Sequence, residues 1–164
     1  MSTTTEMHLG HPGGGEGYRF DYKGMHRYYI ALPTFKSRAL FRDKTLVRPV
    51  LDALRDAGQE HHFDVYAYCF LPDKLVLIVR GKDPRSDMKV FLSAFRLASS
   101  AAALPAIGHP LWQRRYLERV LRKTENSADA AKEIFTLPAK AGLVAPQAPY
   151  EFQGSFVMPG REPA

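Results

Sequence analysis

The sequence predicts an α+β protein with a ferredoxin-like split βαβ fold, in which an antiparallel sheet carries helices on one face and is followed by a C-terminal helix. The predicted elements come in the order strand, helix, strand, strand, helix, strand, helix. The two central strands are separated only by Pro72-Asp73, a turn signal that favours an antiparallel hairpin. The length of 164 residues and a hydrophobic content of 45% suit one domain with one core.

The predicted strands are short aromatic or aliphatic runs. The first, residues 27–32, reads RYYIAL and is closed by Pro33. The hairpin consists of residues 63–71, FDVYAYCFL, and residues 74–80, KLVLIVR. A fourth strand is expected within YLERVL, residues 116–121.

The predicted helices are marked by apolar spacing and caps. The first helix shows apolar residues at helical spacing from Val47 to Leu54. Gly58 is expected to end it, and Pro49 is expected to lie in its first turn. The second is capped by Ser86 or Asp87, and its buried stripe is Met88, Phe91, Leu92 and Phe95. It is expected to end near Ala103, before Pro105. The third helix is expected to be capped by Ser127 and to run through about Leu137, before Pro138.

Composition divides the chain and suggests its compartment. Residues 1–24 are expected to form a disordered Gly-rich tail, residues 25–154 the domain, and residues 155–164 a C-terminal tail. No apolar run approaches the length of a membrane span, so no membrane is expected as a partner. The N-terminus lacks a hydrophobic signal core, and a single cysteine, Cys69, fits a reducing compartment. We therefore expect a cytoplasmic protein.

The charge suggests a polyanionic partner. The net charge is +6 and the pI is near 9.5. Five basic residues fall between positions 114 and 123, with one aromatic among them and another just before them. The basic residues are Arg114, Arg115, Arg119, Arg122 and Lys123, and the aromatics are Tyr116 and Trp112. Guanidinium groups could pair with phosphates while aromatics stack on unpaired bases. The alternative is a solvated basic face in which Trp112 anchors the loop. Arg96 and Lys89, seven residues apart, could extend the patch.

No metal or nucleotide motif is present. The six histidines include no HxH or HxxxH pair, and ordinary surface histidines are the favoured interpretation. GxGxxG, GxxxxGK[ST] and GxSxG are also absent.

Two segments resemble the REP-associated tyrosine transposases, members of the single-tyrosine HUH family. The first is RYYIALPTFKSRALFRD, residues 27–43; the second runs from HPLWQ at residue 109 to PAKAGLV at residue 144. PLWQ followed by a helix and P-x-[RK]-AGLV is specific in combination, and the resemblance covers about residues 26–154.

The resemblance implies a nuclease that cuts single-stranded DNA near a hairpin. In that family a tyrosine attacks the phosphodiester and keeps a covalent link, while two histidines on one strand bind a divalent metal such as Mg. Residues i and i+2 of a strand share a face, so both imidazoles reach one ion.

The family's three chemical positions are substituted here. Its turn and strand read roughly M-P-N-H-V-H-L-L, and aligning them places Lys74 and Val76 at the histidine positions. Counting back from AGLV places Glu133 at the tyrosine position. Valine has no donor atom, a lysine ammonium repels a divalent ion, and glutamate cannot form the phosphotyrosine link. The HUH motif is therefore lost, and no metal or other cofactor is expected.

Other residues could take over part of the chemistry. Tyr116, Tyr66 and Tyr68 are candidate nucleophiles by residue type only, and tyrosines on core strands usually pack. Lys74 could contact a phosphate directly or could merely end the strand with its ammonium in water.

The sequence thus predicts a transposase-like protein that binds single-stranded or hairpin DNA. It also predicts that the DNA cleavage and joining of the resembling family are lost. Whether the protein is an enzyme stays open. The predicted DNA-binding residues are Arg38, Arg42, Arg96, Trp112, Arg114 and Arg115, with Trp112 either stacking or structural. Two alternatives stay open: an active transposase or nickase using unconventional residues, and a protein-interaction module on the same scaffold. A homodimer could form, as in the resembling family.

Overall fold

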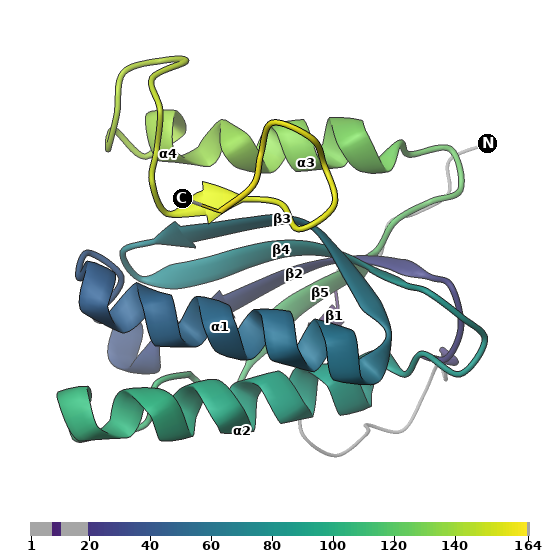
Figure 1. Cartoon of the computed structure of the whole chain (residues 1–164), viewed down its shortest axis with the longest axis horizontal. Coiled ribbons are helices and arrows are strands. Elements are labelled where there is room, and N and C mark those ends of the chain that lie inside the picture. The colour runs from purple at the N-terminus through teal and green to yellow at the C-terminus, as the bar shows by residue number, and fades with distance from the viewer. Residues whose placement is uncertain (1–7, 11–19, 164) are drawn as a thin grey trace.

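The protein is built on one six-stranded antiparallel sheet, seen in a computed structural model that describes the backbone of residues 8–10 and all of residues 20–163 (Figure 1). The strand order is β1-β5-β2-β4-β3-β6. The strands are β1 (His8–Gly10), β2 (Arg27–Pro33), β3 (Phe63–Leu71), β4 (Lys74–Gly81), β5 (Tyr116–Val120) and β6 (Gln153–Gly154). The central four, β5-β2-β4-β3, have the ferredoxin-like order, so the predicted fold class is confirmed.

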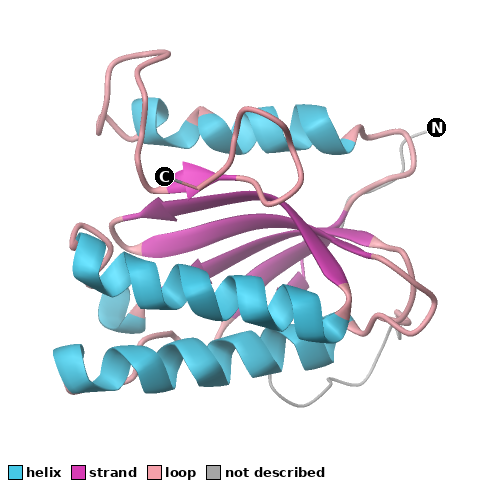
Figure 2. Ribbon diagram, in the orientation of Figure 1, coloured by secondary structure: helices cyan, strands magenta, loops and turns pink. Residues whose placement is uncertain are grey.

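Helices cover both faces of the sheet (Figures 1 and 2). The α1 helix (Lys44–His61) and the α2 helix (Met88–Ile107) lie side by side on one face. The α3 helix (Ser127–Phe135) lies on the other, followed by the short α4 (Leu137–Lys140), and a 3-10 turn, η1 (Phe35–Ser37), follows β2. Alternate side chains of β4 point to opposite faces of the sheet. Leu75 and Leu77 belong to the apolar cluster under α1 and α2, and Val76 and Ile78 belong to the cluster under α3.

The α1 helix is longer at both ends than predicted. The Asp43 side chain accepts a hydrogen bond from the Thr45 backbone N–H at 2.9 Å and caps the helix, so Pro49 lies inside it rather than in its first turn. The helix also continues through Gly58, which is no stop. A Cβ at that position would lie 3.0 Å from the Phe63 carbonyl oxygen, a tight contact, so Gly58 lets the helix pack closely on β3.

The α2 helix also passes its predicted end. Asp87 caps it as expected, but it includes Pro105 in its last turn and ends at Gly108, where φ is +71°. The helix is long and apolar enough to cross a membrane by length and composition alone, contrary to the sequence expectation. Its inner residues Met88 and Phe91 are buried against the sheet, as in a core helix.

The domain extends beyond both predicted boundaries. Residues 1–7 and 11–19 of the predicted N-terminal tail lie outside the described residues. In the described part of that tail, β1 pairs with β5, and the side chains of Phe20 and Tyr22 pack against the core. At the other end, β6 pairs with β3, Ser155 is buried, and Phe156 packs on the core. Scattered aromatic residues give these segments enough apolar surface to join the fold.

Candidate nucleic-acid interface

The strand face that the resemblance assigns to metal ligands is packed with apolar side chains. Val76 is 1% exposed and belongs to a buried cluster formed by β3, β4, α3 and Leu121. Its other members are Ala67, Cys69, Leu71, Ile78, Ala131 and Ile134. The α3 helix therefore seals this face of β4 against solvent. Among the described residues, no group of three His, Cys, Asp or Glu side chains could hold a metal ion. The absence of a cofactor stays a prediction.

Lys74 lies on the same face of β4 but at its exposed beginning. Its alternation with Val76 puts both residues on the side of the sheet that α3 covers. Burial raises the pKa of the Cys69 thiol to about 12, and the positive charge of Lys74 acts in the opposite direction. The ammonium group thus lies close to the rim of the apolar cluster and is open to solvent.

Glu133, at the tyrosine position, does not face the sheet. It is exposed on α3, whereas its neighbours Ala131 and Ile134 are buried against β3 and β4. A side chain at this position therefore lies on the outer surface of the helix, away from Val76.

The alternative tyrosines have packing roles. Tyr68 is 1% exposed on the α1 side of the sheet, and burial raises its pKa to about 12. Tyr116 is also buried, and its hydroxyl accepts a hydrogen bond from Lys89 Nζ at 2.9 Å. Tyr66 is half-buried against the cluster under α3. A high pKa and a buried ring both oppose formation of a phenolate nucleophile at Tyr68.

Exposed cations gather where three loops meet at one end of the sheet, on the left in Figure 1. The Thr34 N–H donates to the Asp73 carbonyl at 2.9 Å, and the Gln113 N–H donates to the Pro33 carbonyl at 3.0 Å, so the segments 34–43, 72–74 and 109–115 adjoin. We call this surface the basic end. Its exposed basic residues are Lys36, Arg38, Arg42, Lys74, Arg114 and Arg115.

An aromatic pair lies within the basic end. The half-buried rings of Phe35 and His109 stack with centroids 5.2 Å apart and planes 29° apart. Lys36 Nζ lies 5.3 Å and Arg38 Cζ 5.9 Å from the centroid of the Phe35 ring. Lys36 and Ser37 both have φ of +53°, an uncommon conformation for residues with a side chain and one that clusters at functional sites. Sequence reasoning missed this pair, because Phe35 and His109 are 74 positions apart (109 − 35).

Trp112 belongs to the core, which corrects its assignment as a base-stacking residue. It is 7% exposed and packs between Phe41 and Phe95, with ring centroids 5.6 and 5.8 Å away. Its Nε1–H donates to Ser99 Oγ at 2.8 Å. With both faces covered, the indole has no face open to a base, and the structural alternative holds.

Several other basic residues of the predicted patch are engaged within the protein. Arg96 is half-buried, donates to the Gln113 carbonyl at 2.6 Å, and lies over the Tyr116 ring. It positions the loop that carries Arg114 and Arg115 rather than extending the exposed patch. Arg119 forms a two-point pair with Glu125 at 2.7 and 3.0 Å.

Lys89 is the second basic residue expected to extend the patch. Its Nζ lies 3.2 Å from both carboxylate oxygens of Glu118, which is 2% exposed. The Tyr22 hydroxyl donates to the same carboxylate at 2.6 Å. This partly buried network ties α2 to β5 and engages the Lys89 ammonium within the protein, although the Lys89 side chain is 37% exposed.

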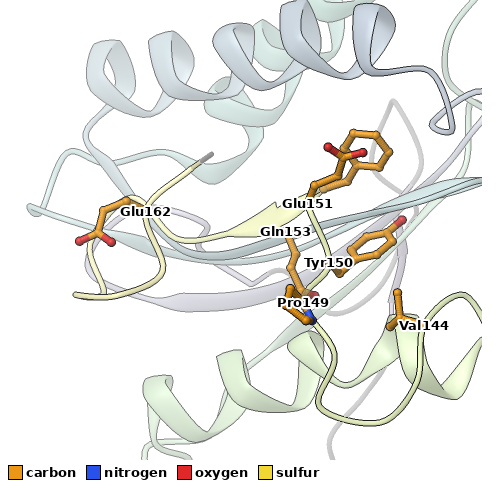
Figure 3. Close-up of a pocket in the computed structure, with 7 residues that line it drawn as sticks. Val144, Pro149, Tyr150, Glu151, Gln153 and Glu162 are labelled. Atoms are coloured by element: carbon orange, nitrogen blue, oxygen red, sulfur yellow. The ribbon is translucent and has the colours of Figure 1, made fainter.

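A pocket of about 640 Å³ lies beside β6, and its lining does not include the aromatic pair (Figure 3). It is lined by Val144, Pro149, Tyr150, Glu151, Phe152, Gln153 and Glu162. The Tyr150 hydroxyl donates to the Phe70 carbonyl at 2.6 Å and is not free for chemistry. The pocket's ionisable lining includes Glu151 and Glu162, whose charge repels phosphates, so the pocket is a poor site for nucleic acid.

Comparison with known proteins places the fold. No family model and no curated protein matches the sequence. The structure is similar to that of a REP-associated tyrosine transposase bound to a REP hairpin, with a TM-score of 0.69, 19% identity, and coverage of 85% of this chain and 82% of that one. It is also similar to a candidate transposase from Deinococcus radiodurans R1, with a TM-score of 0.50, 20% identity, and coverage of 76% and 96%. The resemblance predicted from the sequence is thus confirmed at the level of the fold: the chain has a transposase-like fold, that of the REP-associated tyrosine transposases.

Proposed function

We propose that the protein binds hairpin-bearing single-stranded DNA at the basic end and does not cleave or join it. The observation that carries the proposal is that six exposed cations lie on the same three adjoining loops that carry the stacked Phe35 and His109 rings. The cations would neutralise phosphates, and the ring pair would accept an unpaired base. The transposase that shares the fold was solved with a hairpin, which supports the same class of ligand.

The packing of the second face supports the loss of cleavage. A phosphoryl transfer of the family's kind needs a metal and a nucleophile at one phosphate. Here Val76 is enclosed by apolar side chains and Glu133 lies on the outer surface of α3. The two positions therefore do not share a solvent-filled site. Lys74, at the rim, would contact a phosphate by charge alone, without a metal.

A binding titration tests the proposal. Fluorescently labelled hairpin DNA with a single-stranded flank is titrated with the protein, with and without Mg²⁺, over a series of salt concentrations. We expect binding that is independent of Mg²⁺ and that weakens with salt, with a slope of log K on log salt of about −0.7 for each single-strand phosphate neutralised. A covalent DNA adduct lost on mutating one tyrosine would establish the nickase alternative instead. Equal affinity for DNA and for a neutral polymer would favour the protein-interaction alternative.

Matched variants locate the surface. Arg115→Ala should weaken binding and lower the salt slope by about 0.7, because one phosphate contact is lost. Arg85→Ala removes an equally exposed arginine from the loop before α2, outside the basic end, and should change neither quantity. Phe35→Ala should weaken binding by about 1–3 kcal/mol if one base stacks on the pair. Equal losses for Arg85→Ala and Arg115→Ala would show that binding is spread over the whole basic protein.

A further inference from the structure

The α2 helix has an exposed apolar face that the proposed DNA site does not use. From Val90 to Ile107 the only charged residue is Arg96, whose guanidinium bonds inward to the Gln113 carbonyl. Large apolar side chains on an uncharged helix face are typical of an interaction surface. The large residues of this face are Val90, Leu97 and Leu104, which are 49%, 76% and 52% exposed.

A groove of about 380 Å³ lies between α1 and α2, beside this face (Figure 1). Ala94 lines the groove and lies one helical turn from Leu97, so the groove and the exposed face form one continuous apolar surface. Small side chains leave room for the side chains of a partner. The apolar lining consists of Pro49, Ala53, Ala57, Ala94, Ala98 and Ala102.

The charged residues of the groove are all acidic, among the described residues that line it. Asp52, Asp56 and Glu60 fall at i, i+4 and i+8 of α1, so they form a row along one side of that helix. Asp52 forms an ion pair with Arg55 at 3.5 Å, so the argument depends on Asp56 and Glu60, which are exposed. In a chain of net charge +6, a row of carboxylates beside an apolar groove is complementary to a cationic partner.

The acidic row decides between the possible occupants of the groove. Carboxylates repel a nucleic-acid backbone. A second copy of this chain would bring a second row of the same carboxylates to the interface, and like charges oppose association. A helix that lies in a lipid surface carries lysine and arginine beside its apolar face, whereas here the residues beside that face are acidic. A protein segment that combines apolar and basic side chains fits both the groove and the row.

We propose that the groove between α1 and α2 binds a basic amphipathic helix of another protein. Apolar side chains of that helix pack on Leu97 and enter the groove between the alanines, and its lysines or arginines pair with Asp56 and Glu60. The surface from Val90 to Leu104 is about 21 Å long at 1.5 Å per residue, which matches about four turns of a partner helix. The groove includes no residue of the basic end, so the proposal does not depend on DNA binding.

A designed peptide tests the groove. The probe is a fluorescein-labelled peptide of about 18 residues, with leucine at i, i+3, i+4 and i+7 of each heptad repeat and lysine elsewhere. We expect saturable one-to-one binding to the full chain, measured by fluorescence anisotropy, that weakens as NaCl is raised. A peptide with glutamate in place of each lysine should bind at least about tenfold more weakly. A scrambled peptide of the same composition, which has no apolar face, should show the same loss.

Matched variants locate the peptide on the groove. Asp56→Lys should weaken its binding at least about threefold, because an attraction becomes a repulsion, whereas Glu133→Lys makes the same charge change on α3 and should have no effect. Leu97→Ser should also weaken binding at least about threefold through lost apolar contact. Leu143→Ser, at a 37% exposed leucine after α4, should not. All four positions are exposed, so circular dichroism should show that each variant keeps the fold.

The two binding proposals can fail separately. Phe35→Ala should leave peptide affinity unchanged, and Leu97→Ser should leave hairpin DNA affinity unchanged. A peptide that shows no saturable binding up to about 1 mM would overturn the groove proposal. Equal affinity for the ordered and scrambled lysine peptides, or equal affinity of Asp56→Lys and Glu133→Lys for the ordered one, would do the same. Self-association of the chain, or its binding to phosphatidylcholine vesicles, would also overturn the proposal if Leu97→Ser abolished it, because another occupant would then cover this surface.

Discussion

Truncation of Ile134 tests whether α3 closes the face of β4 that the resemblance assigns to metal ligands. Ile134 is 2% exposed and packs in the cluster that contains Val76. Ile134→Ala removes three carbon groups at about 0.8 kcal/mol each and leaves a cavity, so we expect a loss of about 2–5 kcal/mol in the free energy of unfolding. At about 2–4 °C per kcal/mol for a chain of this size, Tm should fall by about 5–15 °C.

Urea unfolding followed by Trp112 fluorescence measures the effect, because Trp112 is the only tryptophan and is buried. Glu133→Ala is the matched control on the same helix, one residue away but exposed, and should change stability by no more than about 0.5 kcal/mol. If Ile134→Ala cost no more than Glu133→Ala, then α3 would not be docked on β4 in solution, and the ligand face would be open. The reasoning about lost cleavage would then fail.

Three further variants probe other parts of the structure. Trp112→Phe removes the indole N–H that donates to Ser99 Oγ, while the Ser99 hydroxyl keeps its own hydrogen bond to the Phe95 carbonyl, so the variant should cost about 0.5–1.5 kcal/mol of stability by urea titration, with DNA binding retained. The pKa of Glu125 is lowered to about 2, chiefly by the hydrogen bond from Arg119. The stability that this carboxylate contributes is therefore present above its unfolded pKa near 4.5 and is lost as the pH falls toward 2. Glu125→Gln should flatten the curve of unfolding free energy against pH between these two values. Lys36→Gly relieves the positive φ and should raise Tm slightly, by no more than the equivalent of about 1 kcal/mol, while weakening DNA binding through the lost charge.

Local patterns predicted the elements well because their causes are local. The apolar run of β4, the Pro72-Asp73 turn and the Asp87 cap each depend on neighbouring residues, and all are found as expected. Helix ends were predicted less well. Pro49 and Pro105 were expected to limit α1 and α2, but a proline is tolerated where capping and tertiary packing outweigh the loss of one hydrogen bond.

The candidate site was predictable only in part. Arg38, Arg42, Arg114 and Arg115 are exposed at one end of the sheet, as a basic interface requires. Residue type alone cannot distinguish an exposed aromatic ring from a buried one, which is why Trp112 was assigned to DNA.

The ring pair in the basic end could not be found without the fold. Phe35 and His109 meet only because the Phe35 N–H donates to the Leu111 carbonyl at 2.8 Å and holds the two loops together. A contact between loops so far apart in the sequence leaves no local signal.

The environment of Val76 bears on whether this position could hold the histidine that the resemblance assigns to it. An imidazole at this position would enter a cluster in which Ile78, Ala131 and Ile134 offer no hydrogen-bond partner, and an unsatisfied buried polar group costs about 2–7 kcal/mol. A total stability of about 5–15 kcal/mol leaves little room for that cost. Lys74→His at the exposed rim would cost far less, yet it supplies one ligand only. Packing therefore favours valine at this position, and the apolar cluster under α3 contributes to the stability of the fold.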